Sequence, residues 1–319
     1  MILYISDGEV ERLATMADAI DCLEAAFRSW KSDGTATQPR TTLPLPGRRM
    51  LRTMAASLPA LDAFGYKASF NMGGGGSQLV MLYSLSENRL IAMIEAGLLG
   101  LIRTGAASGV ATRHLARQNA VTVGLIGAGT HGRSQLMAMA TVRPIARARV
   151  FSRNKETRER FARDVGRELG IEIVAANSAR AAVEGADILI TATRGTESVL
   201  LGDWLVPGVH INAMGANAAG RRELDDAAVL KCDRVAVDDL AQSKLEAGEL
   251  IGLVAAGRRR WDDFVELGDI VRGAQPGRKA AGEITLFNSL GIAFEDVAFA
   301  RWIYDRAVER GLGKRLELP

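Results

Sequence analysis

The stretch that decides the fold reads Val121-Thr-Val-Gly-Leu-Ile126 and continues as Gly127-Ala-Gly-Thr-His-Gly132. The first six residues form a compact apolar run typical of a buried strand, and Ser134–Thr141 has the pattern of a helix. A strand, a turn with the pattern G-x-G-x-x-G and a helix, in this order, are the context in which the pattern binds a dinucleotide. The alternative interpretation is a glycine-rich turn that binds no ligand.

Each glycine of this turn has its own physical role. Gly127 permits the tight turn after the strand, Gly129 lets the backbone approach the pyrophosphate, and Gly132 lets the helix pack closely on the strand. The start of the helix adds unpaired N–H groups and the positive end of its dipole. We therefore expect cofactor contacts along the whole turn, from Gly127, Ala128, Gly129, Thr130, His131 and Gly132.

Strands and helices alternate after the turn. A charged amphipathic helix is expected over 155–169, and the short apolar runs expected as strands are 149–151, 171–174, 187–193, 210–214 and 235–238. Such alternation predicts an α/β fold with a doubly wound parallel sheet of the Rossmann type. We assign this dinucleotide-binding domain to residues 119–289.

The rest of the sequence predicts a second, mixed domain. The run Thr15-Met-Ala-Asp18 has the pattern of a helix capping box, and strands are expected over 2–5, 51–58, 65–70, 79–84 and 91–96. A helix over 293–310 ends at Gly311 and is expected to return to this domain. The tract Gly73–Gly76 is equally compatible with a flexible turn and with close approach of the backbone to a ligand. We therefore assign a discontinuous α+β domain to residues 1–118 and 290–319.

The end of the second strand of the dinucleotide-binding domain indicates which dinucleotide is bound. An NAD site commonly presents an acidic residue to the ribose 2′-hydroxyl about 20 residues after the glycines. Here the chain reads Ser152-Arg153-Asn154. Arg153 can pair with a 2′-phosphate, to which Ser152 and Asn154 can donate hydrogen bonds. The pattern predicts a preference for NADP(H) with NAD(H) possible; alternatively, Arg153 stacks on the adenine without contacting a phosphate.

Composition argues against several classes of function. The 319 residues carry 40 Lys and Arg against 37 Asp and Glu, a net charge of +3, and 5% are aromatic, so no nucleic-acid partner is expected. No apolar run is long enough to span a bilayer. The distant Cys22 and Cys232, with no recognisable secretory leader, favour a cytoplasmic protein without disulfides. No metal site is expected, because the histidines lack ligand spacing: His114, His131 and His210.

Several further motifs, in order, resemble the ornithine cyclodeaminase/μ-crystallin family. They are Arg103-Thr-Gly-Ala-Ala-Ser108, the glycine turn, Ile211-Asn-Ala-Met-Gly-Ala-Asn217 with Glu223-Leu-Asp-Asp226, and Glu283-Ile-Thr-Leu-Phe-Asn-Ser-Leu-Gly291 with Glu295-Asp296. The resemblance covers most of the chain. It implies a Rossmann domain, a substrate-binding and dimerisation domain, and a homodimer.

The resemblance also implies how a small α-amino, α-imino or α-keto acid is held beside the nicotinamide. The family binds the substrate carboxylate with two arginines and a lysine, which correspond to Arg40, Lys67 and Arg103. Arginine offers two parallel N–H donors to a carboxylate. The structural alternatives are a surface arginine for Arg40, a structural ion pair for Lys67 and a helix salt bridge for Arg103.

Two positions are singled out for catalysis. Lys67 is expected near the imine carbon and nitrogen, and Asn217 stands where the family's cyclodeaminases have an aspartate. An amide cannot act as a general base at neutral pH, so the hydride-transferring members are the better match. The segment Glu283–Asn288 is expected to close the site. The further cofactor contacts are expected from Thr104, Ala192, Thr193, Met214 and Gly215.

We therefore predict an enzyme that reduces a cyclic ketimine carboxylate, 1-pyrroline-2-carboxylate or 1-piperideine-2-carboxylate, to L-proline or L-pipecolate. Three alternatives stay open. One is an amino-acid dehydrogenase of the alanine dehydrogenase type. Another is ornithine cyclodeaminase, which forms L-proline and ammonia from L-ornithine. The third is a non-catalytic protein that binds NADPH and a small ligand, as μ-crystallin does.

Overall fold

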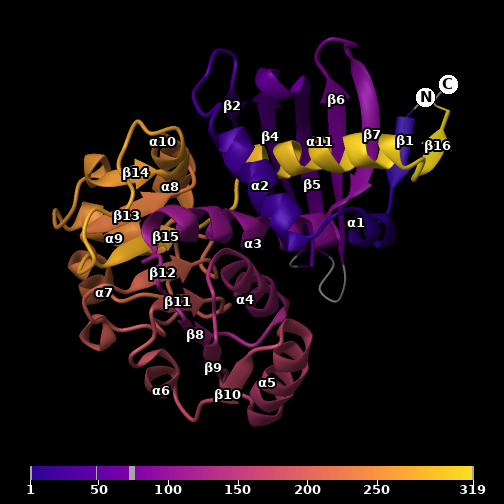
Figure 1. The fold of residues 1–319 in the computed structure, drawn as a ribbon. Coiled ribbons are helices and arrows are strands. Elements are labelled where there is room, and N and C mark those ends of the chain that lie inside the picture. Colours follow the sequence, from indigo (N-terminus) through magenta and orange to yellow (C-terminus); the bar gives the residue numbers. More distant parts are fainter. Residues whose placement is uncertain (1, 48, 72–75, 318–319) are drawn as a thin grey trace. The chain divides into compact units, whose positions relative to one another are not determined.

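The computed structural model describes residues 2–47, 49–71 and 76–317. The chain divides into two compact units (Figure 1): unit 1 comprises Met1–Thr104 and Gly291–Pro319, and unit 2 comprises Gly105–Leu290. The chain first passes from unit 1 to unit 2 inside the helix α3 (Ala96–Leu115), whereas the sequence-based boundary lies just after it. Gly73–Gly75 of the glycine tract lie outside the described residues.

Unit 1 is built on a mixed sheet in the order β16-β1-β7-β6-β5-β4-β2, with β3 also paired to β4. Its strands are β1 (Ile2–Ile5), β2 (Ala36–Thr37), β3 (Thr41–Leu45), β4 (Arg49–Leu58), β5 (Ala63–Asn71), β6 (Gly76–Ser84), β7 (Arg89–Glu95) and β16 (Lys314–Leu316). β4 to β7 form an antiparallel meander, and β1 joins β7 in parallel. The strands expected in this part of the chain are thus confirmed. β1 has the expected bounds, β4, β5 and β6 are slightly longer than expected, and β7 begins two residues and ends one residue before the expected 91–96 run.

The helix α11 (Ala293–Glu309) lies across one face of this sheet, over β4, β5 and β6, and also contacts α1 (Asp7–Leu13) and α2 (Met16–Phe27) (Figure 1). The 3₁₀ turn η1 (Pro59–Leu61) connects β4 to β5. The expected capping box is confirmed, since the Thr15 hydroxyl accepts from the Asp18 N–H and the Asp18 carboxylate accepts from the Thr15 N–H. α11 returns to unit 1 as expected, and its Phe294 stacks on Phe27 of α2 at 5.1 Å between ring centroids.

Unit 2 carries a parallel sheet. Its strands are β8 (Thr122–Ile126), β9 (Arg147–Phe151), β10 (Glu172–Ala175), β11 (Ile188–Thr191), β12 (His210–Ala213), β13 (Arg234–Val237), β14 (Phe264–Glu266) and β15 (Thr285–Asn288). The helices and 3₁₀ turns between them are α4 (Thr130–Val142), α5 (Lys155–Leu169), α6 (Ala179–Val183), η2 (Gly202–Trp204), α7 (Asp226–Lys231), α8 (Leu240–Glu246), α9 (Gly248–Ala255), η3 (Trp261–Asp263) and α10 (Leu267–Val271).

The order of the sheet is β10-β9-β8-β11-β12-β15-β13-β14, and each pair of neighbours runs parallel. This confirms the α/β doubly wound fold. The chain builds outward from β8 to β10 and then restarts at β11 on the other side of β8. Ligands of such sheets bind outside the carboxyl ends of the strands at this switch point. The turn Gly127–Gly132 follows β8 and therefore lies at that edge.

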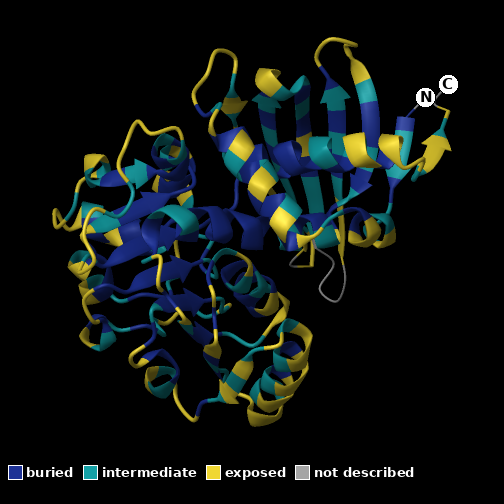
Figure 2. Ribbon diagram, in the orientation of Figure 1, coloured by how far each residue is buried: buried dark blue, intermediate teal, exposed yellow. Residues whose placement is uncertain are grey.

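The segment expected to close the site has a different role. Thr285–Asn288 is the strand β15, which pairs with β12 on one side and β13 on the other, and Figure 2 shows the centre of this sheet as buried. A strand held on both sides cannot fold over a ligand, so this expectation was wrong. The sequence hid the strand because a fully buried strand lacks the alternation that identifies a half-buried one.

Within the described ranges, no helix has both the length and the apolar character that a membrane crossing requires. Across the same residues, no three His, Cys, Asp or Glu side chains gather into a group able to hold a metal ion. Both cysteines are free thiols, and burial raises the pKa of Cys22 and of Cys232 to about 12.

Candidate active site

The glycine turn has the geometry that its sequence predicts. Gly127 has φ +122°, in the region that favours glycine, and a β-carbon there would collide with the Ala192 carbonyl oxygen. A β-carbon on Gly132 would collide with the Gly127 carbonyl oxygen, so close packing of α4 depends on this glycine. Gly129 is the N-cap of α4, and a β-carbon there would meet nothing within 4 Å. The turn thus leaves open space in front of the N-terminus of α4, which fits a pyrophosphate.

The residues after β9 are arranged around the start of α5. Asn154 is the N-cap of α5, and its side-chain oxygen accepts from the Thr157 N–H at 2.7 Å, so only its amide N–H groups can face a ligand. The Ser152 hydroxyl donates to the Asn154 carbonyl at 3.1 Å, while Arg153 is exposed. Arg158, which the sequence analysis did not single out, lies 5.6 Å from the centroid of the Phe151 ring.

The carboxyl ends of β11 and β12 carry the positions expected near the nicotinamide. Ala192 and Thr193 follow β11, and Met214 and Gly215 follow β12. The Ala192 N–H donates to the carbonyl of Ile126, the last residue of β8, at 2.9 Å. The hydrogen bonds between β8 and β11 therefore continue to the end of β8. All four of these residues are half-buried.

A buried carboxylate, Glu223, joins these two strand ends. Its Oε1 accepts from the N–H and the hydroxyl of Thr193 at 2.6 and 2.7 Å. Its Oε2 accepts from the Gly215 N–H at 2.6 Å and from the Thr191 hydroxyl at 2.8 Å. Burial raises the pKa of Glu223, against these hydrogen bonds, which lower it. Glu223 belongs to one of the motifs shared with the family, but the sequence predicts no role for it.

A second buried carboxyl supports the first. Glu249, in the first turn of α9, accepts from the Glu223 N–H at 2.7 Å. Burial, with the negative charge of Glu223, raises the pKa of Glu249 to about 7, although its hydrogen bonds and the nearby Arg222 oppose the rise. Near neutral pH the Glu249 carboxyl is therefore partly protonated.

The two remaining predicted positions of this set have different surroundings. Thr104 is buried in α3, and its hydroxyl donates to the Gly100 carbonyl at 2.7 Å within the same helix. Asn217 is half-buried in the loop that follows β12. Their roles toward a cofactor or substrate stay predictions.

Unit 1 brings the predicted substrate-binding cations together. Lys67 on β5 and Arg103 on α3 are 7% and 5% exposed, and both contact Asp296 in the first turn of α11. The Lys67 ammonium lies 2.7 and 2.8 Å from the two carboxylate oxygens of Asp296, and Arg103 Nε donates to Asp296 at 2.8 Å. Arg103 also donates to Glu295 at 2.7 Å. The ion pair anticipated as the structural alternative for Lys67 is thus present, whereas Arg103 pairs with acids of α11 and not with a residue of its own helix.

Burial and the neighbouring charges together set the pKa of Lys67. Burial and the positive charges of Arg103 and Arg40 lower the pKa of the Lys67 ammonium to about 8, against Asp296, which raises it. Lys67 is therefore mostly protonated at neutral pH but close enough to its pKa to give up a proton. A β-carbon on Gly100 would lie 4.0 Å from the Lys67 nitrogen, so the ammonium faces a position without a side chain.

Arg40 joins this group through the backbone of Gly291. Its guanidinium donates to the Gly291 carbonyl at 3.0 Å, and Arg40 is half-buried rather than on the open surface. Gly291 has φ +72°, and a β-carbon there would lie 2.9 Å or less from both terminal nitrogens of Arg103. Gly291 therefore lets the chain pass directly beside two arginines.

Charge explains what this cluster can do. Lys67, Arg103 and Arg40 carry three positive charges, and Glu295 and Asp296 carry two negative charges, which leaves a net charge of +1. The four buried charges of Lys67, Arg103, Glu295 and Asp296 cancel, so the excess belongs to the half-buried Arg40, which attracts an ion of opposite sign. The cluster therefore favours one carboxylate. The sequence contained a signal for the two acids: Glu295 and Asp296 stand among apolar residues at the start of the helix, and buried acids require cations.

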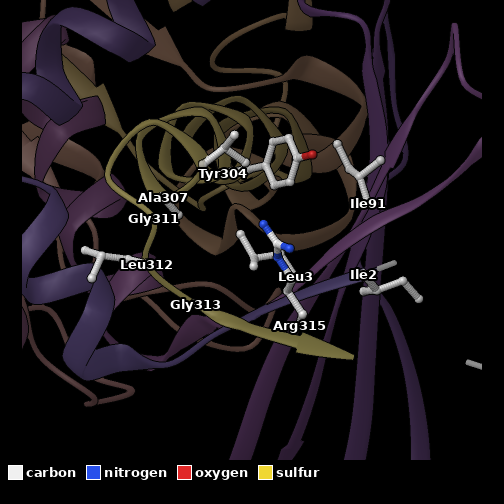
Figure 3. Close-up of a pocket in the computed structure, with 10 residues that line it drawn as sticks. Ile2, Leu3, Ile91, Tyr304, Ala307, Gly311, Leu312, Gly313 and Arg315 are labelled. Carbon is white, nitrogen blue, oxygen red and sulfur yellow. The ribbon is translucent and has the colours of Figure 1, made fainter. Parts of the chain in front are cut away.

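A separate pocket of about 280 Å³ lies elsewhere in unit 1 (Figure 3). It is lined mainly by apolar residues of β1, β7 and the end of α11, together with the exposed Arg315. It contains none of the predicted site residues, and it lacks the buried ion pairs of the Lys67 cluster.

Comparisons with known proteins agree with this arrangement. The sequence model of the ornithine cyclodeaminase/mu-crystallin family matches residues 3–311. A Delta(1)-pyrroline-2-carboxylate reductase of Bacillus cereus is 33% identical over 325 residues, covering 99% of this chain and 100% of that protein.

Two solved structures are similar over the whole chain. Thermococcus litoralis Delta(1)-pyrroline-2-carboxylate reductase in complex with NADH and L-proline has a TM-score of 0.94 at 33% identity and covers 99% of this chain and 100% of its own. An archaeal alanine dehydrogenase dimer with bound NAD has a TM-score of 0.92 at 30% identity and covers 100% of this chain and 99% of its own. The chain therefore belongs to the ornithine cyclodeaminase/mu-crystallin family.

Proposed function

We propose that this protein reduces a cyclic ketimine carboxylate, 1-pyrroline-2-carboxylate or 1-piperideine-2-carboxylate, to L-proline or L-pipecolate with a reduced nicotinamide dinucleotide. The observation that carries the proposal is the cluster around Lys67, in which the half-buried Arg40 adds one positive charge to balanced buried ion pairs and the pKa of Lys67 is lowered to about 8. The reductases named among its relatives support the same reaction.

In the proposed reaction, the reduced nicotinamide supplies a hydride to the imine carbon when it is bound. Arg40 and Arg103 hold the substrate carboxylate, because guanidinium groups offer paired donors to its oxygens. Lys67 keeps a proton on the ring nitrogen, which accepts the electron pair of the C=N bond. Asp296 holds the Lys67 ammonium and the Arg103 guanidinium in place.

The dinucleotide is assigned to unit 2. The Gly127–Gly132 turn holds the pyrophosphate, and the strand ends at Thr193 and Gly215 hold the nicotinamide. The open space at Gly129 and the position of the turn at the switch point support this assignment. Hydride transfer requires contact between the nicotinamide and the imine carbon. Holding two reactants in such contact is worth roughly 7–11 kcal/mol of the activation barrier.

A panel of substrates tests the proposal against its alternatives. We expect oxidation of the cofactor with 1-pyrroline-2-carboxylate or 1-piperideine-2-carboxylate in the absence of ammonia. A strict requirement for ammonia with pyruvate identifies an amino-acid dehydrogenase, and proline formed from ornithine without net cofactor use identifies a cyclodeaminase. Cofactor binding without oxidation of any of these mixtures contradicts the enzymatic proposal and favours a binding protein.

Asn217 argues for reduction rather than cyclodeamination. The amide cannot accept the proton that the cyclodeaminase aspartate takes. We propose that Asn217 instead orients the substrate or the nicotinamide through hydrogen bonds. Asn217→Asp tests this role, because gain of ornithine cyclodeamination is expected only if the position lies at the reacting atoms.

We also propose that NADP(H) is preferred over NAD(H). The support is the set Ser152, Arg153 and Asn154 after β9, where an acidic partner for the 2′-hydroxyl is absent from the sequence. Arg153→Asp is expected to raise the KM for NADPH and lower the KM for NADH, whereas Arg163→Asp, at an exposed position farther along α5, is the matched control. Equal KM values for the two cofactors in the wild type contradict this preference.

A homodimer is proposed on two grounds. The archaeal alanine dehydrogenase relative is a dimer, and unit 1 exposes Leu43 and Tyr66, 56% and 37% accessible, on its sheet strands. Sedimentation equilibrium at micromolar concentration is expected to give twice the mass of the chain. A monomer at that concentration contradicts the proposal.

A further inference from the structure

Glu223 is the residue on which the strand ends of unit 2 converge. Its side chain is 1% exposed and accepts four hydrogen bonds, two from Thr193, one from Gly215 and one from Thr191. Two of these donors are backbone N–H groups, at the first turns after β11 and β12. A carboxylate is the side chain able to accept from four donors at once.

The backbone of Glu223 is held as firmly as its side chain. Its N–H donates to Glu249 at 2.7 Å, and its carbonyl accepts from Val199 and Leu200 at 2.7 and 3.0 Å. A β-carbon on Gly248 would collide with the Arg221 carbonyl, so the start of α9 packs directly on the same loop. The Glu223 side chain thus joins the two ends of the loop from Gly215 to Glu223, and the start of α9 packs against this loop.

Gly215 and Asn217 lie in this loop, and Met214 directly precedes it. Thr193 lies just after the end of β11. Gly215 has no room for a side chain, because a β-carbon there would lie 2.5 Å from the Thr193 N–H nitrogen. The distance between the two strand ends is therefore set by the Glu223 carboxylate and by the lack of a side chain at Gly215. A shift of either end changes the surface that a nicotinamide ring would contact.

We propose that Glu223 is a positioning residue for the nicotinamide half of the cofactor: it holds the ends of β11 and β12 at the separation that the ring requires. The inference rests on the proposed function for the location of the ring. The hydrogen bonds of the Glu223 side chain go to Thr191, Thr193 and Gly215, at the ends of β11 and β12 and not at the turn Gly127–Gly132. Loss of Glu223 is therefore expected to disturb the nicotinamide half and to spare the other half.

Glu223→Gln is the informative change, because its amide nitrogen is a donor and would face either the Thr193 N–H or the Gly215 N–H. Hydroxyl groups can rotate to accept a hydrogen bond, but a backbone N–H cannot. Glu266→Gln is the matched control: Glu266 is also a buried acid of unit 2, accepts from the Leu240 N–H at 2.9 Å, and belongs to a different strand end.

The experiment compares dissociation constants by calorimetry for NADPH with 2′-phospho-ADP-ribose and for NADH with ADP-ribose. The two fragments, 2′-phospho-ADP-ribose and ADP-ribose, lack the nicotinamide. The dissociation constant of a fragment divided by that of the matching dinucleotide therefore isolates the contribution of the nicotinamide, and the measurement needs no substrate. We expect Glu223→Gln to lower this ratio about tenfold or more, with fragment binding unchanged within about twofold of the wild type and of Glu266→Gln. Hydride transfer to the ketimine, where it occurs, is expected to slow with KM for the acid little changed.

Three outcomes overturn the inference. One is equal loss of fragment and dinucleotide binding, which shows a general structural role. Another is an unchanged ratio with an unchanged rate. The third is a wild-type ratio near one, since no ring contact then exists to be positioned. If Glu223→Gln does not fold, Glu223→Asp, which keeps the charge but shortens the reach, is read by the same ratio. A wild type that binds dinucleotides but reduces no ketimine refutes the proposed function while leaving this test decisive.

Discussion

Replacing Asp296 by asparagine tests how the ion-pair cluster controls Lys67. Asp296 is fully buried, lies 2.7 Å from the Lys67 ammonium and opposes the burial that lowers the pKa of this lysine to about 8. Loss of an opposite charge at contact distance changes a pKa by about 1–3. We therefore expect the Lys67 pKa in Asp296→Asn to fall to about 5–7.

The consequence for catalysis follows from the fraction of Lys67 that carries its proton. At pH 7.5 a pKa of about 8 leaves roughly three quarters of Lys67 protonated, and a pKa of about 7 leaves roughly one quarter. The rate constant kcat/KM for reduction at this pH is thus expected to fall at least about threefold, and roughly two hundredfold if the pKa reaches about 5. In the wild type kcat/KM is expected to decline as pH rises through about 8.

The assay is the pH profile of kcat/KM between pH 5 and 9 for both proteins, with Asp305→Asn as control. Asp305 lies on the same helix but pairs with Arg301 on the surface, so its profile is expected to follow the wild type. Stability is also expected to fall, by less than the roughly 3–5 kcal/mol of a broken buried pair, because Lys67 can lose its proton. An alkaline limb that stays at the same pH in Asp296→Asn refutes this account of Lys67.

Three further changes extend the test. Lys67→Met should abolish reduction while the dissociation constant for the dinucleotide stays within about twofold, measured by fluorescence titration; normal turnover would remove Lys67 from the mechanism. Gly291→Ala should lower the free energy of unfolding by about 2–4 kcal/mol and raise KM for the acid, since φ +72° and the Arg103 guanidinium both oppose a β-carbon; unaltered urea unfolding and KM would contradict this. Glu249, with a pKa of about 7 against 4.5 when exposed, should make stability fall as pH rises from 4.5 to 8, by up to about 3 kcal/mol. In Glu249→Gln the urea midpoint should lose that pH dependence, and an unchanged slope would contradict the assignment.

Local sequence patterns predicted the dinucleotide-binding sheet well because its signals lie close together in the chain. An apolar strand, three glycines at fixed spacing and an amphipathic helix over Lys155–Leu169 each depend on neighbours a few residues away. The structure has α5 at those bounds and β8 just before the glycines. β15 escaped prediction, because its place between β12 and β13 depends on contacts with strands far away in the sequence.

The candidate site shows the same limit. Family resemblance indicated Lys67 and Arg103 as cations near a carboxylate, but no local pattern shows that Asp296 binds both across more than half of the chain. The role of Glu223 was missed for the same reason: its partners Thr193 and Gly215 follow two different strands. Buried carboxylates are paired by tertiary structure, and a single sequence states only that such partners must exist.

The most direct test of the central claim follows the hydride itself. The protein is given 1-pyrroline-2-carboxylate and NADPH carrying deuterium on the transferred position of its nicotinamide C4, and the proline formed is analysed by mass spectrometry and NMR. Our account predicts L-proline with the deuterium at C2, formed in proportion to the cofactor oxidised, from wild type and not from Lys67→Met. Unlabelled proline, or cofactor oxidation without proline, would contradict it.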